Sequence, residues 1–310
     1  MDKPAKAKVP KMKFLEKHPL IMIVIGIAGI SLSAIFVKYS QAPSVVTAFY
    51  RLMWTVVLMT PVVFGRGESR RELMGTDRKS VLLCALSGLF LAMHFTTWFE
   101  SLNKTSVASS TAIVCTEVIW VAIGYCLFLK GRISLAAAGS IFVTVGGSLL
   151  IAFSDYSAGG NHLLGDMLAL AAAVFCAVYT LIGRQARGHM STTVYTYIVY
   201  VFCALALGIA TAASGLAFTG YGARSVIVGL LLSVCSTLLG HSIFSWCLKF
   251  LSPSFVSASK LCEPAVAAVI ALFVFGEVPA PLQIAGGAVT IGGVLLYSHV
   301  EKKENMEKQS

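Results

Sequence analysis

The chain has 310 residues, of which 57% are hydrophobic and only 12% are charged, and its formal net charge at pH 7 is +10. Soluble globular domains average about 25% charged residues, so this composition excludes a water-soluble protein and predicts a membrane protein. In a membrane protein, an excess of basic residues indicates orientation in the bilayer and contact with anionic lipid, and nucleic acid is excluded as a partner.

Ten apolar stretches follow one another along the chain, and each is as long as the roughly 20 residues that a transmembrane helix requires. They cover residues 18–38, 43–64, 78–101, 104–129, 132–153, 163–186, 191–214, 224–250, 252–275 and 279–298, numbered here as spans 1 to 10. The predicted fold is therefore an all-α membrane protein with ten transmembrane helices. The polar segment at 65–77 is predicted to be a loop.

Basic residues alternate between the two ends of these spans. The two tails and every second connection hold 19 of them, whereas the opposite end holds three, Lys38, Lys104 and Arg224. Because lysine and arginine beside spans are retained in the cytoplasm, the bias predicts cytoplasmic termini in a multi-pass protein of the plasma membrane. The basic head at 1–17 has no small-residue cleavage site and is interpreted as a retained cytoplasmic tail, as is the segment 299–310.

The two halves of the chain carry similar patterns. Segment 101–151 ends with LFLKGRISLAAAGSIFVTVGGSLLI and segment 250–297 ends with LFVFGEVPAPLQIAGGAVTIGGVLLY, so the same order of span, charged turn, small-residue span and double glycine recurs. A repeat of five spans is odd-numbered, so the second copy at 163–298 enters the membrane from the side opposite to the first copy at 18–153. Inverted repeats are common in secondary transporters, whose site lies at the membrane midplane between the halves. The turn at 155–162 is the predicted external connection.

Longer motifs also recur. The second half contains LSPSFVSASKLCEPAVAAVIALFVFGEVPAPLQIAGG, and the first half contains AFYRL in span 2 and SLNKTSVASSTAI entering span 4. With these motifs the chain resembles EamA-type members of the drug/metabolite transporter superfamily over residues 18–298. It departs from the family in having Val118 where span 4 usually has proline, and Lys130-Gly131 where Gly-Glu usually stands. The resemblance implies export or exchange of small metabolites such as amino acids, amines and drugs.

Eight cysteines all lie within the spans, without a CxxC pair or a spacing with histidine that suits a metal. They are interpreted as packing residues, so no metal site, disulfide or cofactor is predicted. The motifs HExxH and GxSxG and the Walker sequence are absent, which disfavours a membrane-embedded enzyme and direct drive by ATP. A channel or a structural subunit of an assembly stays open as the alternative to a transporter.

Charged side chains inside the spans are few, and each is a candidate site residue because insertion scales assign about 2.5–3.5 kcal/mol to such a group at a helix centre. The candidates are Arg51, Glu117, Lys260 and Glu263, with His94 and His241 as titratable companions. A rise of about 1.5 Å per residue places both glutamates near the middle of their spans. The two signs together suit an amino acid or an amine, so we expect a small-molecule metabolite as substrate, with proton exchange as one means of driving export.

Lys260 and Glu263 are three residues apart, which places both on one face of a helix. In one interpretation they form an intrahelical ion pair. In the other, Pro264 cannot bond to the carbonyl of Lys260, so the backbone is interrupted and the segment lines the pathway or acts as a hinge. Glu117 has three open roles: substrate ligand, proton carrier, or partner of Lys260 or Arg51 in an ion pair between the repeats. For Arg51, snorkelling toward the interface is the alternative to a site role.

Aromatic and imidazole groups recur around these charges. His94 and Trp98 are four residues apart on span 3, and His241 lies on span 8, a set that suits a wall for a polar or cationic solute. Alternatively, the histidines form hydrogen bonds between helices, and the tryptophan is an interfacial anchor. Tyr200 and Tyr179 are further candidates for the cavity wall.

Small residues recur at every fourth position in spans 5 and 10. They are Ala136, Ser140, Thr144 and Ser148 in span 5, and Ala288 and Gly292 in span 10. This spacing lets helix backbones approach closely, either against a neighbouring span or across a homodimer. Spans 5 and 10 are therefore expected to be scaffold or assembly surface.

Overall fold

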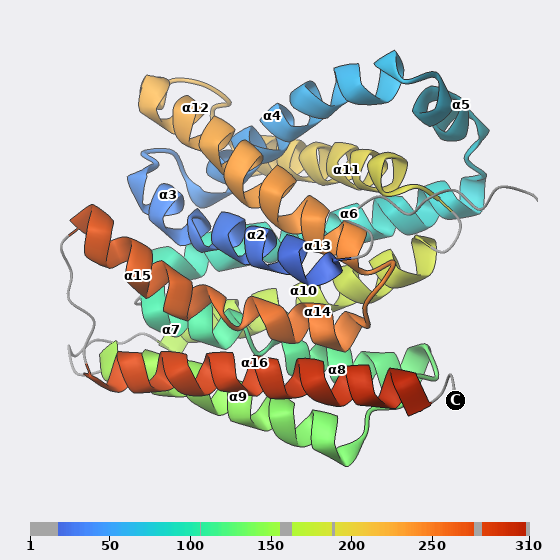
Figure 1. The fold of residues 1–310 in the computed structure, drawn as a ribbon. Helices are drawn as coiled ribbons and strands as arrows, with labels where there is room; N and C mark the ends of the chain where they lie inside the picture. The colour runs from blue at the N-terminus through green and yellow to red at the C-terminus, as the bar shows by residue number, and fades with distance from the viewer. Residues whose placement is uncertain (1–17, 106, 156–162, 188–189, 276–280, 308–310) are drawn as a thin grey trace, which may run out of the picture.

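A computed structural model of the chain describes residues 18–105, 107–155, 163–187, 190–275 and 281–307, and every regular element in these ranges is a helix (Figure 1). The predicted all-α class is confirmed. The predicted tail at 1–17 and most of the predicted external connection, at 156–162, lie outside the described residues.

Six helical segments in the described ranges are long and apolar enough to cross a membrane. They are Pro19–Tyr39, Ser44–Gly65, Arg78–Lys104, Leu163–Ala186, Thr192–Ala213 and Gly222–Cys247. Three shorter apolar stretches, Glu117–Phe128, Leu135–Gly147 and Ile284–Tyr297, lie within predicted spans 4, 5 and 10. Length and composition thus indicate a protein that crosses a membrane several times.

Six predicted spans contain one uninterrupted helix each. These helices are α4 (Ser44–Gly65), α6 (Arg78–Lys104), α9 (Leu135–Asp155), α10 (Leu163–Ala186), α11 (Thr192–Ala213) and α16 (Pro281–Glu307). The other four spans are divided. Span 1 contains α2 (Pro19–Ser31) and α3 (Ser33–Tyr39); span 4 contains α7 (Val107–Val114) and α8 (Glu117–Phe128); span 8 contains α12 (Gly222–Leu231), the π-helix η2 (Leu232–His241) and α13 (Ser242–Cys247); span 9 contains α14 (Pro253–Lys260) and α15 (Glu263–Phe275). Irregular backbone at membrane depth is tolerated where protein or a wet cavity covers it, so the divided spans mark where a cavity is expected.

Two segments predicted to lie outside the spans contain helix, which corrects their boundaries. The connection at 65–77, predicted to be a loop, contains α5 (Gly67–Gly75), and α16 continues to Glu307 instead of ending at 298. Both segments are rich in glutamate, lysine, arginine, leucine or methionine, which are good helix formers. Asp77 then caps the start of α6 by accepting a hydrogen bond from the Ser80 backbone nitrogen at 3.1 Å.

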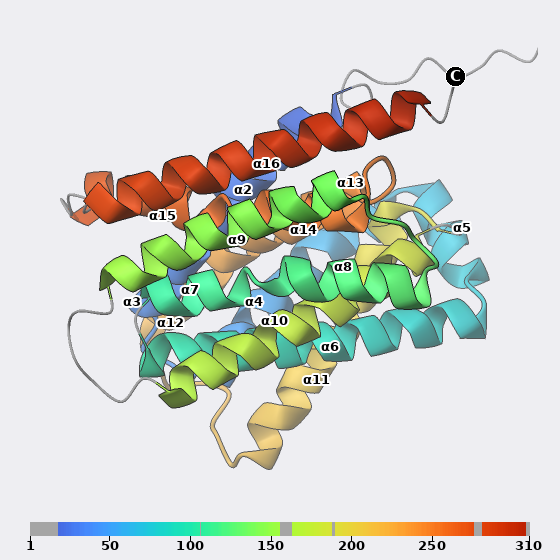
Figure 2. The same ribbon diagram turned by 90° about the horizontal axis from the view of Figure 1, so that it is seen from below.

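Helices from the two halves of the chain pack against each other in pairs. α9 lies along α16, α6 lies along α10, α2 contacts η2, and α4 contacts α11 (Figures 1 and 2). The largest hydrophobic cluster includes residues of α4, α6, α10 and α11, among them the fully buried Phe95, Leu102 and Tyr200. The divided spans also meet, since α14 packs on α8, and both α14 and α15 pack on α2. The interruptions of spans 1, 4 and 9 are therefore close together.

Spans 5 and 10 face each other through small residues within the chain, among them Thr144 of the predicted set. The predicted Ala136, Ala288 and Gly292 are exposed and are not part of the close contact, which Gly147 and Gly293 make instead. A Cβ added to Gly147 would lie 2.5 Å from Thr290 Oγ1 and 2.7 Å from the Gly286 carbonyl oxygen, and one added to Gly293 would lie 2.3 Å from Thr144 Oγ1. Helices α9 and α16 therefore approach so closely that a side chain would clash at these contacts. The predicted close packing against a neighbouring span is confirmed.

Replacing Gly147 by alanine should destabilise the protein by about 1–3 kcal/mol, because the new methyl group overpacks against the backbone of α16. Gly146 is the matched control, since a Cβ there would meet no atom within 4 Å. Gly146→Ala gains the roughly 1 kcal/mol preference of a helix for alanine without a clash. Unfolding midpoints in detergent compare the two variants, and equal midpoints would contradict the close contact of α9 with α16.

Candidate functional site

Two of the divided spans are interrupted in the same way. In span 4, α7 ends at Val114 and α8 begins at Glu117, and in span 9, α14 ends at Lys260 and α15 begins at Glu263. Each two-residue turn thus presents a glutamate at the first position of a new helix, where the helix dipole favours a negative charge. The spans touch at these turns, since the Cys115 sulfur lies 3.9 Å from the Lys260 carbonyl oxygen.

Proline accounts for only one of the two interruptions. Pro264 is the second residue of α15, where a missing N–H is no loss, so it starts a helix and does not kink one. The predicted interruption of span 9 is confirmed. In span 4, the Thr116 nitrogen bonds to the Ile113 carbonyl at 3.0 Å and the Ile119 nitrogen bonds to the Thr116 carbonyl at 2.9 Å, which are tight three-residue turns. Val118 in the place of proline therefore leaves the pair of turns intact.

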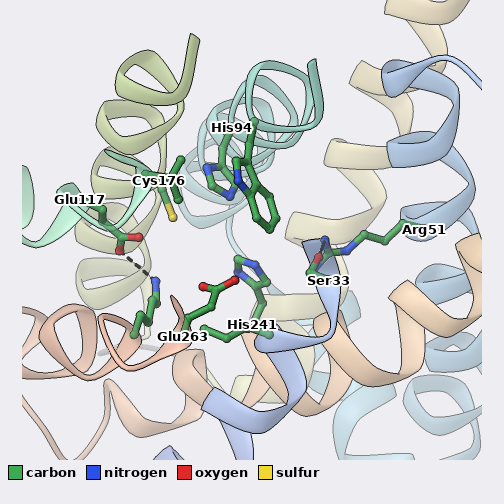
Figure 3. A pocket seen from close by; sticks show the side chains of 11 residues that line it. Ser33, Arg51, His94, Glu117, Cys176, His241 and Glu263 are labelled. Atoms are coloured by element: carbon green, nitrogen blue, oxygen red, sulfur yellow. Dashed lines mark hydrogen bonds and ion pairs between the residues drawn. The ribbon is translucent and has the colours of Figure 1, made fainter. Parts of the chain in front are cut away.

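A small cavity lies between the divided spans (Figure 3). Its wall consists of eleven residues: Ile30, Ser33, Arg51, His94, Trp98, Val114, Glu117, Cys176, His241, Lys260 and Glu263. Both halves of the chain contribute, through spans 1 to 4 and spans 6, 8 and 9. The space open to the centre of a water molecule is about 30 Å³, which holds about two ordered waters. Seven of the residues predicted from the sequence are thus brought to one cavity.

One ion pair joins the two halves of the chain at this cavity. Lys260 Nζ lies 2.9 Å from Glu117 Oε1, which also accepts a hydrogen bond from Thr180 Oγ1 at 3.2 Å. The Cys176 thiol points toward the same carboxylate (Figure 3). The interpretation of Lys260 and Glu263 as an intrahelical pair is wrong, because the helix ends between them and their spacing no longer places them side by side. Of the roles open for Glu117, the structure contains the ion pair between the halves.

Glu263 and Trp98 are buried in the cavity wall with unused hydrogen-bonding capacity. They are 6% and 4% exposed, and neither Glu263 Oε1 nor Trp98 Nε1 has a hydrogen-bond partner among the described residues. Leaving a buried donor or acceptor unsatisfied costs about 1–3 kcal/mol. These are therefore the groups of the wall that a polar ligand would satisfy. Because Trp98 is buried here, its interpretation as an interfacial anchor is wrong.

Arg51 is fully buried, so the interpretation that it snorkels to the membrane surface is wrong. Its Nε donates to Thr237 Oγ1 at 2.7 Å, and its Nη1 donates to Ser33 Oγ at 3.2 Å. The guanidinium carbon lies 4.1 Å from the centre of the Phe95 ring. No carboxylate in the described part of the chain lies within ion-pair distance of this guanidinium. Thr237 belongs to η2, and π-helical turns are frequent at functional sites.

The histidines form the aromatic side of the wall together with Trp98. His94 Nδ1 lies 3.0 Å from the carbonyl oxygen of Ala172 on α10, so the predicted hydrogen bond between helices is confirmed for His94. Its ring stacks on Trp98 with centroids 5.9 Å apart and planes 20° apart. The His241 ring lies 6.2 Å from the His94 ring. Three ring systems thus border the same cavity.

The two tyrosine candidates are not part of the cavity wall that the structure describes. The Tyr179 hydroxyl lies 2.9 Å from Ser245 Oγ, and the Tyr200 hydroxyl lies 2.9 Å from Ser242 Oγ, both serines being in α13. The Tyr179 ring lies 6.2 Å from the His241 ring. These tyrosines therefore lie behind the wall and position span 8.

Four wall residues are absent from the set predicted by sequence reasoning. They are Ile30, Ser33, Val114 and Cys176. Val114 stands three residues before its glutamate, as Lys260 does in span 9, so alignment of the two repeats could have found it. Cys176 was expected to be a packing residue, and nothing in the local sequence marks Ile30 or Ser33 as part of a wall.

Comparison with known proteins gives consistent results. The EamA-like transporter family model matches residues 18–153 and again 163–299. A probable terminal-alkyne amino-acid exporter of Streptantibioticus cattleyicolor is 28% identical over 284 residues, covering 88% of this chain and 84% of the exporter. An uncharacterized transporter of Clostridium kluyveri is 24% identical over 277 residues, covering 87% of this chain and 88% of the relative. A solved crystal structure with 13% sequence identity superposes with a TM-score of 0.74 over 93% of this chain and 98% of the other, and it shares the fold.

These matches confirm the resemblance carried by the motifs, because the family model recognises both halves and the relatives align along most of the chain. Together with the apolar helices, they identify a multi-pass membrane protein. The chain belongs to the EamA-like transporter family.

Proposed function

We propose that the protein is a secondary-active exporter of a zwitterionic amino acid or a related amine, working by alternating access in the plasma membrane. The observation that carries the proposal is the charge distribution in the cavity wall. Lys260 and Glu117 neutralise each other, whereas Arg51 and Glu263 have no ion-pair partner among the described residues. The amino group of the solute would bind Glu263, and its carboxylate would bind Arg51. One relative, the exporter of S. cattleyicolor, is named for an amino acid.

For the membrane topology we propose two inverted five-helix repeats, at 18–153 and 163–298, with both termini in the cytoplasm. The helix contacts support this arrangement because they persist when each span is exchanged with its counterpart. Exchanging each span for its counterpart in the other repeat turns the contact of α6 with α10 into the contact of η2 with α2, which is also present. The same exchange leaves the pairs α4–α11, α8–α14 and α9–α16 unchanged. A two-fold axis in the membrane plane produces such a pattern. The bias of basic residues supports the orientation.

The remaining wall residues favour an ammonium group and an apolar side chain. Trp98 and His94 present stacked rings to the cavity that Glu263 also lines. A cation over a tryptophan ring gains about 0.5–2 kcal/mol, more when water is excluded. Ile30 and Val114 are apolar, which suits a solute such as leucine or phenylalanine. Arg51 is then the residue that distinguishes an amino acid from the corresponding amine.

The size of the cavity supports the proposal of alternating access. Room for about two waters is too small for an amino acid, so one wall moves outward for loading and another for release. The turns of spans 4 and 9 supply the joints, with Pro264 as the hinge of span 9. We include proton exchange in the proposal, with Glu263 as the carrier, because it is the carboxyl group of the described cavity wall that has no ion-pair partner. Glu117 is bound to Lys260 and is left out of this role.

Transport by an Arg51→Gln variant tests the proposal. In proteoliposomes, the wild type should show saturable uptake of leucine or phenylalanine, and weaker uptake of the corresponding amines, isopentylamine and phenethylamine. Arg51→Gln should lower kcat/KM for the amino acids at least about tenfold, the worth of a charged hydrogen bond, and leave the amines nearly unchanged.

Lys104→Gln is the control, because it removes a basic residue from a solvent-exposed pair with Glu100 and should change neither class of substrate. Flux that rises linearly with concentration would indicate a channel in place of a transporter. Absence of flux for both classes would remove these amino acids and amines as substrates.

A further inference from the structure

A second buried guanidinium lies directly after α10, outside the cavity wall. Arg187 is 4% exposed, and its Nη2 donates to Thr192 Oγ1 at 2.7 Å, whereas Nε and Nη1 have no hydrogen-bond partner among the described residues. The guanidinium carbon lies 5.6 Å from the centre of the Tyr195 ring. A buried cation with two unused donors costs several kcal/mol unless an anion completes its surroundings.

The neighbouring groups that the structure describes do not supply that anion. Arg184, one turn earlier, is half-buried and donates to the Leu248 carbonyl, so it bridges α10 to the end of span 8. The Glu72 carboxylate accepts a hydrogen bond from the Ser191 backbone nitrogen at 2.5 Å. No ion pair involves Arg187 in the ranges that the structure describes. This arginine therefore differs from its neighbour in having donors left for a ligand.

Arg187 extends a buried face of α10 that begins at the cavity. Cys176, Thr180, Gly183 and Arg187 are three or four residues apart and buried, and Cys176 belongs to the cavity wall. From Cys176 to Arg187 the distance along the helix is about 16 Å, at about 1.5 Å per residue. Gly183 keeps this face close to the next helix, since a Cβ there would lie 2.7 Å from the Tyr195 hydroxyl. This buried face therefore connects the cavity wall to Arg187.

Hydroxyl groups close the region between Arg187 and the cavity. The Tyr195 hydroxyl lies 2.9 Å from Ser87 Oγ, and the Tyr179 hydroxyl lies 2.9 Å from Ser245 Oγ. Exchanging one such hydrogen bond for another with water or solute has a small net cost. These contacts can therefore open for a polar solute when the helices separate.

We propose that Arg187 is a second carboxylate-binding subsite, which captures the solute at the cytoplasmic mouth before the solute reaches Arg51. The proposal rests on the proposed function, from which it takes the substrate class and the orientation. The bias of basic residues assigns this end of α10 to the cytoplasm, and an exporter loads from that side. The unused guanidinium donors suit carboxylate oxygens. An amine without a carboxylate would pass this point unbound.

Uptake into inside-out membrane vesicles tests the subsite, because such vesicles present the cytoplasmic face to the buffer. The probes are leucine and phenylalanine, and their decarboxylated counterparts isopentylamine and phenethylamine. Arg187→Gln should raise the KM for the amino acids about tenfold, with kcat nearly unchanged, and should leave both constants for the amines as in the wild type. Arg187→Lys restores the charge and should recover part of the loss.

Arg184→Gln is the matched control, since it removes an arginine one turn away whose guanidinium already has a carbonyl partner. Rates are normalised to folded protein measured by size-exclusion chromatography, and Arg187→Lys provides the comparison if Arg187→Gln fails to fold. An unchanged KM for the amino acids, or an equal rise for the amines, would eliminate the subsite. If wild-type vesicles transport none of the four probes, the proposed function fails first and the subsite with it.

Discussion

Replacing Lys260 by methionine is expected to destabilise the protein by about 3–5 kcal/mol, because Glu117 is left as a buried charge without its partner. The two residues are 8% and 5% exposed, and their charged atoms are 2.9 Å apart. Methionine is flexible and fills much of the volume of lysine, so the lost charge accounts for the change more than a cavity does. Thermal unfolding of the purified protein in detergent measures the effect.

The double variant Glu117→Gln with Lys260→Met should regain most of this stability, since no charge of the pair remains buried. Lys104→Met is the control for loss of a lysine, because its ion pair with Glu100 is exposed to solvent and such pairs contribute about 0–1 kcal/mol. A double variant as unstable as Lys260→Met alone would show that the two side chains do not act as a self-contained link between the halves.

The fold class is predictable because composition, the length of apolar stretches and the bias of basic residues are properties of the sequence alone. The interruptions of the spans are harder to predict. Pro264 marks one, but span 4 turns between Val114 and Glu117 without proline or glycine, and span 8 becomes a π-helix at Leu232–His241. In η2, the Thr237 hydroxyl donates to the Leu232 carbonyl at 3.3 Å and accepts a hydrogen bond from Arg51 of span 2, so a side chain from another span supports the altered helix. No single segment reveals such a contact.

The scarcity of charge inside the spans is enough to predict which charged residues surround the cavity, since a charge at membrane depth needs a partner or water. It does not predict how they pair. The spacing of Lys260 and Glu263 favours a pair only in an unbroken helix, and the actual partner, Glu117, is 143 residues away along the chain. Tyr200 was predicted to line the cavity, but its hydroxyl binds Ser242 behind the wall.

Glu263→Gln is expected to lower transport about ten- to hundredfold while the protein remains as stable as the wild type or becomes more stable. Glu263 Oε1 is buried without a hydrogen-bond partner, so exchanging the carboxylate for an amide of the same shape removes no protein contact at that atom. It does remove the one negative charge of the described cavity wall that no lysine or arginine neutralises. A solute ammonium group then loses its counter-charge in a buried site, which is worth about 1.5–3 kcal/mol for a charged hydrogen bond. Transport in proteoliposomes and unfolding in detergent measure the two effects separately.

Glu117→Gln is the matched control, because both glutamates begin a helix at the cavity and only one of them is paired. Breaking the pair with Lys260 should cost stability, whereas Glu263→Gln should not. A third measurement addresses proton exchange: uptake by the wild type should respond to an imposed pH gradient, and the residual uptake by Glu263→Gln should not. Normal transport by Glu263→Gln would mean that the amino group is bound elsewhere. Glu117 would then be the remaining carboxylate of the described wall, and it could bind the solute only by exchanging Lys260 for the incoming ammonium group.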